Sequence, residues 1–319
     1  MTKVLVTGSS SLVGSHFVEK YGEKYDLSAI GRTNLFGGKS SLSKFTKVDL
    51  TATGLLRDAV LANDAEFVIN FAAETSVDRC ESERGRTDGM AYQTNTAAAR
   101  SLAAACRESG KVLYQISTDA VFDGTSGPYS ERARPGPVHR NLSWYGQTKF
   151  LAEREVAELT DFCIVRISYP YRSVCPRKLD FARNILRLYE AGRLYPLFVD
   201  QRISPTLIDD LSAALDFLIK HDARGTYHVA SRNLTTPFEF GCQLISTFFS
   251  VKNPERILKK GSVQEASFSR DRAPRPTRGG LKTFKIMRMG FTPRTFEEGI
   301  REIFRQSKGN IDRYPIGAE

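Results

Sequence analysis

The run Thr7-Gly8-Ser9-Ser10-Ser11-Leu12-Val13-Gly14-Ser15-His16 decides the fold of this chain. It follows the apolar stretch Val4 to Val6 and leads into a helical pattern, so a glycine turn joins a strand to a helix. Glycine permits a tight turn through which backbone N–H groups and the positive helix end face a pyrophosphate. The spacing is GxxGxxG with Ser11 at the middle position, which puts a small hydroxyl beside the phosphates. The residues expected to bind a dinucleotide here are Gly8, Ser10, Ser11, Leu12, Val13 and Gly14.

Beyond this turn, short apolar runs alternate with longer amphipathic stretches. Continuous apolar runs are typical of strands that are buried on both faces. The pattern therefore predicts an α/β protein with a Rossmann doubly wound parallel sheet and a smaller, partly interleaved C-terminal substrate lobe. We place the Rossmann domain at residues 1–167, with 201–231 returning to it, and the lobe at 168–200 and 232–319. The apolar runs are Val4 to Val6, Leu27 to Ile30, Phe67 to Phe71, Val112 to Ile116 and Cys163 to Ile167.

The composition excludes several classes of protein. With 41% hydrophobic and 26% charged residues, the 319-residue chain is not expected to be disordered. It has no apolar stretch of the ~20 residues that a membrane span needs and no basic-then-apolar leader, so a cytoplasmic protein without a membrane partner is expected. The five cysteines include no CxxC pair, which favours reduced thiols. The four histidines, His139 among them, show no metal-ligand spacing, so no metal is expected.

The positive charge is concentrated near the C-terminus. Of the net +10, residues 252–319 contribute 16 basic minus 8 acidic residues, or +8. This region has no zinc-finger, helix-turn-helix or RNP-like signature, so a small polyanion is a better expected partner than nucleic acid. A solvated basic face without any partner remains the alternative.

Three further segments follow predicted strands on the cofactor side. Arg32 stands where an acidic residue would bind a ribose 2′-OH, and an Arg there suits a 2′-phosphate, which favours NADP(H) and leaves NAD(H) open. Asp49, followed by Leu50, is placed to accept from an adenine amino group or to cap the next helix. The small residues of Phe71-Ala72-Ala73 leave room for the cofactor.

A tyrosine and a lysine provide the candidate acid and its partner. Tyr145 and Lys149 are four residues apart in a predicted helix and so share one face. A phenol is a weak acid with a reference pKa of ~10, and a nearby ammonium favours its phenolate. The same lysine can contact the nicotinamide ribose while Tyr145 protonates a reduced carbonyl. Thr118, at the end of a predicted strand, is expected to orient that carbonyl.

At this point the chain resembles the extended short-chain dehydrogenase/reductases, and within them the dTDP-4-dehydrorhamnose reductases. The resemblance implies hydride transfer from a nicotinamide cofactor to the C4 keto group of a nucleotide-linked deoxysugar, with Tyr145 as acid, Lys149 as its partner and Thr118 as the third member. A homodimer is compatible with it. The motifs that carry it are TGSSSLVGSH, Val68 to Glu83, Ser117 to Gly124, Tyr145 to Lys149, Asp180 to Leu186, Asp200 to Leu211 and Ala273 to Ile300.

The resemblance also implies a set of substrate-side residues. Arg166, Arg202 and Arg275 are candidates to clamp a diphosphate through bidentate contacts, and a plain surface ion pair is the alternative for each. The full set is Thr75, Val77, Phe122, Arg166, Gln201 and Arg275.

Some residues depart from the family pattern and leave other functions open. Ala120 replaces the usual tyrosine after the STD motif, and Tyr169 stands where a tryptophan is common. A dehydratase would need a Glu after Asp119, which argues against dehydration, whereas 4-epimerisation of a nucleotide sugar stays open. Ser11 and Ala120 also admit a non-catalytic regulatory subunit of the methionine adenosyltransferase β type, although Thr118 and the tyrosine–lysine pair are intact.

Overall fold

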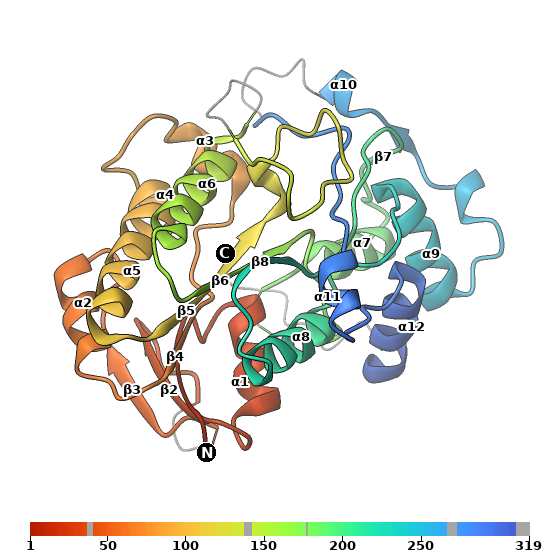
Figure 1. Cartoon of the computed structure of the whole chain (residues 1–319). Coiled ribbons are helices and arrows are strands. Elements are labelled where there is room, and N and C mark those ends of the chain that lie inside the picture. Colours follow the sequence, from red (N-terminus) through yellow and green to blue (C-terminus); the bar gives the residue numbers. More distant parts are fainter. Residues whose placement is uncertain (37–40, 137–141, 177, 267–272, 311–319) are drawn as a thin grey trace.

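A seven-stranded sheet forms the centre of the protein (Figure 1). The structure is a computed structural model, and it describes residues 1–36, 41–136, 142–176, 178–266 and 273–310. His139 and parts of the predicted 232–319 segment lie outside the described residues. The strands are β1 (Lys3–Thr7), β2 (Asp26–Gly31), β3 (Lys44–Lys47), β4 (Phe67–Asn70), β5 (Val112–Thr118), β6 (Phe162–Ile167) and β8 (Gly225–His228).

The strand order in this sheet is β3-β2-β1-β4-β5-β6-β8, and every neighbouring pair is parallel. The order therefore reverses between β1 and β4. Ligands of doubly wound sheets bind at such a switch point, outside the carboxyl ends of the strands. The predicted Rossmann fold is confirmed, and the glycine turn lies at the switch point.

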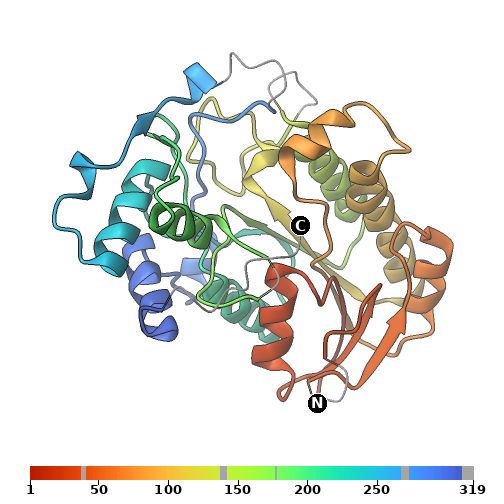
Figure 2. The ribbon, with the colours of Figure 1, turned by 180° about the vertical axis from the view of Figure 1, so that it is seen from behind.

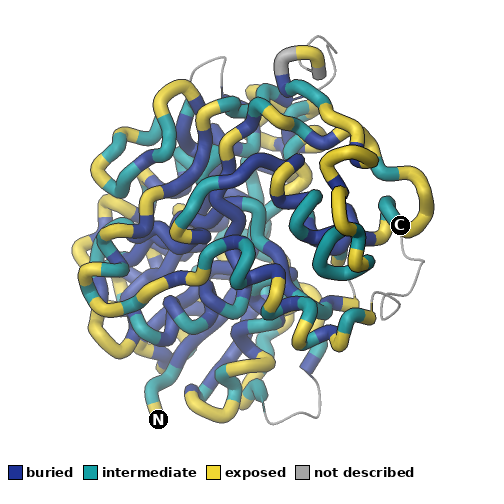
Figure 3. Tube along the Cα trace, turned by 90° about the vertical axis from the view of Figure 1, so that its right-hand side faces the viewer, coloured by how far each residue is buried: buried dark blue, intermediate teal, exposed yellow. Residues whose placement is uncertain are grey.

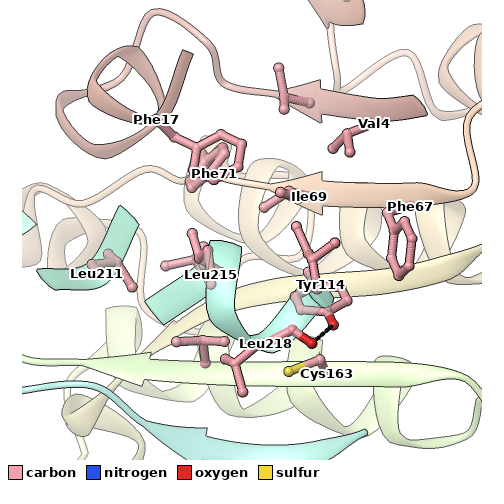
Figure 4. Packing of buried hydrophobic residues seen from close by; sticks show 14 of the residues in the cluster. Val4, Phe17, Phe67, Ile69, Phe71, Tyr114, Cys163, Leu211, Leu215 and Leu218 are labelled. Atoms are coloured by element: carbon pink, nitrogen blue, oxygen red, sulfur yellow. Dashed lines mark hydrogen bonds between the residues drawn. The ribbon is translucent and has the colours of Figure 1, made fainter. Parts of the chain in front are cut away.

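Helices cover both faces of the sheet (Figure 1). On one face, α1 (Leu12–Tyr21) and α8 (Ile208–Lys220) bury Phe17 and Leu215 against β1, β4 and β5, and the Tyr114 hydroxyl donates to Leu218 O at 3.1 Å (Figure 4). On the other face, α2 (Thr53–Leu61), α5 (Ala98–Ser109) and α6 (Trp144–Ala157) pack on a second apolar cluster. Burial on both sides explains why the strands read as continuous apolar runs, and the burial map shows this buried interior (Figure 3).

A smaller group of elements lies beside the C-terminal half of the sheet (Figure 2). It has its own apolar cluster, built around Tyr171, Phe240 and Ile300. A two-stranded parallel sheet of β7 and β9 belongs to it. Its elements are α7 (Phe181–Glu190), β7 (Leu197–Phe198), α9 (Pro237–Phe249), β9 (Lys260–Gly261) and α12 (Phe296–Ser307).

The remaining elements are short, and one of them is a π-helix. This element, η1 (Gln93–Ala97), leads directly into α5. No helix in the described part of the chain is long and apolar enough to cross a membrane. The other short elements are α3 (Val77–Ser82), α4 (Met90–Tyr92), η2 (Asp119–Val121), η3 (Pro254–Arg256), α10 (Val263–Ala266) and α11 (Phe284–Arg288).

Candidate active site

The turn between β1 and α1 is packed so closely that two of its positions admit only glycine. Gly8 has φ +66°, and a Cβ on it would lie 2.6 Å from the backbone nitrogen of Ala72. A Cβ on Gly14 would lie 2.3 Å from the carbonyl oxygen of Gly8. Ser11 is the N-cap of α1, and its Oγ accepts from Gly14 N–H at 2.9 Å. The first turn of α1 thus sits directly on the glycine turn, and Ser11 stabilises it without blocking it.

Asn70, at the end of β4, ties this turn to the neighbouring strands. Its Oδ1 accepts from Thr7 Oγ1 at 2.6 Å and from Ala72 N–H at 3.1 Å, while its Nδ2 donates to Gln115 Oε1 at 2.8 Å. Asn70 and Gln115 are buried, so these hydrogen bonds are protected from water. The Phe71–Ala73 segment is therefore fixed beside the glycine turn.

Arg32 and Asp49 follow β2 and β3, at the same edge of the sheet as the glycine turn. Arg32 is exposed after β2, with its guanidinium open to an anion in solvent. Asp49 accepts from Thr51 N–H at 3.0 Å and from Thr51 Oγ1 at 2.9 Å, and these bonds, with the charge of Arg32, lower the pKa of Asp49. The Asp49 carboxylate thus stabilises the turn before α2, and Leu50 follows it, half-buried.

The start of α6 places the tyrosine beside the end of β5. Ser143 caps the helix by accepting from Gly146 N–H at 3.1 Å. A Cβ on Gly146 would lie 2.2 Å from Ala120 O, so this glycine allows α6 to approach the chain that follows Thr118. Tyr145, the preceding residue, therefore lines the same pocket as Thr118.

The three predicted catalytic residues meet in that pocket. Tyr145 and Lys149 come from one face of α6, and Thr118 comes from the end of β5. Lys149 Nζ donates to Ile116 O at 2.6 Å, and this hydrogen bond fixes the amine beside the C-terminal end of β5. Thr118 Oγ1 accepts from Ala120 N–H at 3.2 Å.

The surroundings of these residues set their charges. Burial raises the pKa of Tyr145, the charge of Asp119 raises it further, and hydrogen bonding to Thr118 partly opposes this rise. Burial lowers the pKa of Lys149 to about 8, against the charge of Glu153. The sequence analysis predicted that Tyr145 acts as an acid, and its raised pKa favours the protonated phenol. A protonated phenol is what a proton donor needs.

The pocket has a volume of about 360 Å³ and joins the glycine turn to the triad. Predicted residues from both the cofactor and the substrate sets line it. They are Ser11, Leu12, Val13, Phe71, Ala73, Thr75, Val77, Thr118, Tyr145, Lys149 and Arg275.

A second cavity of about 700 Å³ continues from this pocket past Tyr169, Phe181 and Arg275, which line both. Its walls carry four aromatic rings, and predicted Gln201 lies in it, donating through Nε2 to Pro276 O at 3.1 Å. The rings belong to Tyr169, Phe181, Tyr195 and Phe198.

Three hydrogen bonds cross the mouth of the pocket, and all three end on the segment from Thr75 to Asp78. Lys178 Nζ donates to Thr75 Oγ1 at 2.9 Å. Arg275 Nη2 donates to Asp78 Oδ2 at 3.2 Å, and Ala273 N–H donates to Asp78 Oδ1 at 3.2 Å. Both cations are near the surface, so an anionic ligand can replace their present partners at little cost.

Two predicted substrate residues lie behind the pocket instead of in it. Arg166, which we expected to contact a diphosphate, is buried and forms a bidentate pair with Glu153. Phe122 is 2% exposed, stacks on Tyr129 at 4.1 Å between ring centroids and lies under the Arg166 guanidinium. Both side chains are thus engaged within the protein.

Sequence reasoning missed several residues that shape the site. Asn95 projects from the π-helix, accepts from Glu74 N–H at 2.9 Å and donates to Thr148 Oγ1 at 3.0 Å, so it fastens the loop before α3 to α6. A π-helix leaves no signal in hydrophobic periodicity. Asp119 lines the pocket, and its place beside Thr118 could have marked it. Tyr169 has φ +42°, a strained conformation that no sequence pattern predicts.

Comparisons with known proteins agree with this architecture. The model of the family described as RmlD substrate binding domain matches residues 1–308. A dTDP-4-dehydrorhamnose reductase from Streptomyces griseus is 35% identical over 243 residues, which cover 73% of this chain and 71% of that protein. The methionine adenosyltransferase 2 subunit beta from Rattus norvegicus is 26% identical over 310 residues, which cover 94% and 86%.

Among solved structures, the dTDP-4-dehydrorhamnose reductase from Bacillus anthracis, in complex with NADP, superposes with a TM-score of 0.76 at 27% identity. The match covers 96% of this chain and all of that one. The resemblance inferred from the motifs is confirmed by these relatives and by the family model. The chain belongs to the RmlD substrate-binding domain family.

Proposed function

We propose that this protein is an NADP(H)-dependent reductase of the 4-keto group of a nucleotide-linked deoxysugar. One observation carries the proposal: the phenol of Tyr145, the hydroxyl of Thr118 and the buried amine of Lys149 share a pocket with a glycine turn at the switch point of the sheet. A turn of this kind suits a pyrophosphate, and a phenol at the far end of the same pocket suits a carbonyl. The reductase relatives support the same assignment.

The residues around the glycine turn fit a dinucleotide. Gly8 and Gly14 let the backbone turn tightly at the start of α1, where a helix N-terminus favours a phosphate, and Ser11 places a hydroxyl there. The exposed guanidinium of Arg32 suits a 2′-phosphate, which favours NADP(H), and NAD(H) remains the alternative cofactor. When bound, the cofactor supplies the hydride.

The chain's own residues then handle the proton and the geometry. Tyr145 donates its proton to the carbonyl oxygen as negative charge develops there. Lys149, held by Ile116 O, places an ammonium near the phenol and stabilises the phenolate that forms. Thr118 orients the carbonyl by donating a hydrogen bond to the same oxygen.

The second cavity supports a substrate that extends beyond the sugar. Its aromatic walls can stack on a nucleobase, and Arg275 stands between it and the catalytic pocket, where a diphosphate would pass. A nucleotide-linked sugar would therefore span both cavities. Thr75 and Val77 line the catalytic pocket near its mouth, and Gln201 lines the second cavity.

The decisive experiment is NADPH oxidation, followed by absorbance, with purified protein and candidate 4-keto nucleotide sugars. We expect oxidation that depends on the keto sugar and a product reduced at C4 by mass spectrometry and NMR. An epimerase would change the sugar without net NADPH consumption. A regulatory subunit like the methionine adenosyltransferase relative would bind NADPH without oxidising it, and either result would contradict the proposal.

The cofactor assignment has a test of its own in Arg32→Glu. Reversal of charge at this position repels a 2′-phosphate and permits a bond to a 2′-OH, so the ratio of NADPH to NADH affinity is expected to fall about 10-fold or more. The dissociation constants can be measured by fluorescence titration. An unchanged ratio would show that Arg32 does not contact the cofactor.

A further inference from the structure

A buried ion pair lies behind Lys149, outside the residues that line the pocket. Arg166 donates to Glu153 through Nε at 2.9 Å and through Nη2 at 2.7 Å, and Ser117 Oγ donates to the same carboxylate at 2.5 Å. The side chains of Arg166 and Glu153 are only 4% and 5% exposed. A carboxylate with three charge-assisted or short hydrogen bonds is fixed in place.

This carboxylate belongs to the catalytic face of α6. Tyr145, Lys149 and Glu153 follow at intervals of four residues and therefore share one side of the helix. The end of β5 meets that side: Ile116 O accepts from Lys149, and Ser117 Oγ donates to Glu153. Glu153 and its partners thus attach the helix to the strand one turn beyond the lysine.

His228 completes the support for Arg166 on the next strand. Arg166 Nη1 lies 3.3 Å from His228 Nε2, and His228 Nδ1 lies 3.1 Å from Lys282 O. Burial and the charge of Arg166 lower the pKa of His228 to about 3, so the ring is neutral, accepts from Arg166 and donates to the carbonyl. The neutral ring orients Arg166, and Glu153 neutralises its charge.

We infer that Glu153, fixed by Arg166 and Ser117, is a positioning residue that keeps the Lys149 amine charged and facing the pocket. The inference rests on the proposed function for its catalytic consequence. Burial alone would favour the neutral amine, because desolvation penalises the ammonium. Glu153 opposes this effect, and the pKa of Lys149 stays at about 8.

The groups around Lys149 leave this role to Glu153. Tyr145 on the same helix is protonated, and Asp119 after β5 is held by Ser168 Oγ at 2.6 Å. Arg166 on β6 is paired with Glu153, and Asp180 is paired with Arg183. Lys178 and Arg275 are cations, and a cation does not favour the ammonium form of Lys149. The titratable and charged groups that surround the amine, on its helix, on the neighbouring elements and along the pocket, are Tyr145, Glu153, Cys80, Tyr92, Asp119, Arg166, Tyr169, Lys178, Asp180, His228 and Arg275.

The test is Glu153→Gln, which keeps the shape of the side chain and removes its charge. We expect the Lys149 pKa, followed by NMR of protein labelled with ¹³Cε-lysine and assigned with Lys149→Met, to fall by about one pH unit. The basic limb of the kcat/KM profile should move to lower pH by the same amount, because the ammonium is lost earlier. At pH 8 this corresponds to a loss of about fivefold, because the charged fraction of the amine falls from about one half to about one tenth.

Three further variants separate this role from a structural one. Glu153→Asp keeps the charge and should restore the wild-type limb. The double variant Glu153→Leu with Arg166→Met replaces the buried pair by apolar groups, a change that folded proteins often tolerate. The basic limb of its kcat/KM profile should still move to lower pH. Glu155→Gln removes a carboxylate from the outer face of α6, where it pairs with Arg100, and should move nothing.

A Lys149 pKa that stays unchanged in Glu153→Gln and in the double variant would overturn the inference, even if both variants were less stable. The NMR measurement needs neither cofactor nor substrate. It therefore supports or overturns the role of Glu153 even if the protein reduces no keto sugar, which would count against the proposed function alone.

Discussion

The two sides of the pocket are built in different ways. On the cofactor side, Gly8 and Gly14 touch neighbouring backbone, and Asn70 joins three strands through buried hydrogen bonds. On the substrate side, the chain is held across the mouth by Lys178 and Arg275, whose partners are exposed side chains. Steric contacts cannot be exchanged, whereas exposed polar contacts can be exchanged for a ligand. The first side is thus shaped before binding, and the second can rearrange on binding.

The sharpest test of this comparison is Tyr145→Phe, because the phenol stands where the two sides meet. Removal of the hydroxyl takes away the proton donor, and turnover is expected to fall by about 10²–10⁴-fold. Steady-state kinetics with NADPH and a keto sugar measure this. The dissociation constant for NADPH should stay the same, because the glycine turn is untouched. Weak NADPH binding by the variant would contradict the role given to Tyr145.

Gly14→Ala tests the cofactor side by introducing a steric clash in the glycine turn. The new Cβ would lie 2.3 Å from Gly8 O, and backbone must move to admit it. We expect a loss of about 1–3 kcal/mol in the free energy of unfolding, measured with urea, and weaker NADPH binding.

Gly54→Ala in α2 is the matched control for Gly14→Ala. A Cβ on Gly54 would have no atom within 4 Å. This variant should be more stable than the wild type by about 0.5–1 kcal/mol, with NADPH binding unchanged. Equal effects of the two substitutions would show that the turn is not closely packed.

The same contrast explains what the sequence could predict. The glycine turn and the Tyr145–Lys149 pair depend on local spacing, so they can be recognised in a single stretch of chain. Arg166 depends on tertiary packing: the register of β5 with β6 sets it opposite Ser117, and α6 brings Glu153 over both. Neither the strand register nor the position of the helix is encoded in a short motif, so the burial of Arg166 could not be predicted from the sequence. The contact of Asn95 likewise depends on a π-helix.

The substrate side can be tested with Arg275→Gln. This change removes the charge between the two cavities, so the KM for a nucleotide sugar should rise about tenfold, the equivalent of one charge-assisted hydrogen bond. The values of kcat and of the NADPH dissociation constant should stay the same. Arg232→Gln, which removes a somewhat more exposed cation paired with Glu298, is the control and should leave KM unchanged. A change confined to NADPH binding would place Arg275 on the cofactor side.

The smallest expected effect concerns Asp119, which lies between the two sides and belongs to neither. Burial raises its pKa from 3.8 to about 6, against hydrogen bonds from Ser168 and Thr118. A raised carboxyl pKa means that the folded protein loses stability as the pH rises through about 4 to 6, because the ionised form is poorly hydrated. The rise corresponds to at most about 3 kcal/mol, and water in the open pocket reduces this to roughly 1 kcal/mol.

Asp119→Asn should therefore be more stable than the wild type by that amount at pH 7, in urea denaturation, and equally stable at pH 3.5. The amide cannot ionise, whereas its oxygen still accepts from Ser168. A gain of the same size at both pH values would trace the effect to packing, and the carboxyl would then have no charge-dependent role at the junction. A gain in the free energy of unfolding at pH 7 alone would mean that the ionised Asp119 destabilises the folded protein. Functional sites often carry such a cost, because their charged groups are arranged for a ligand.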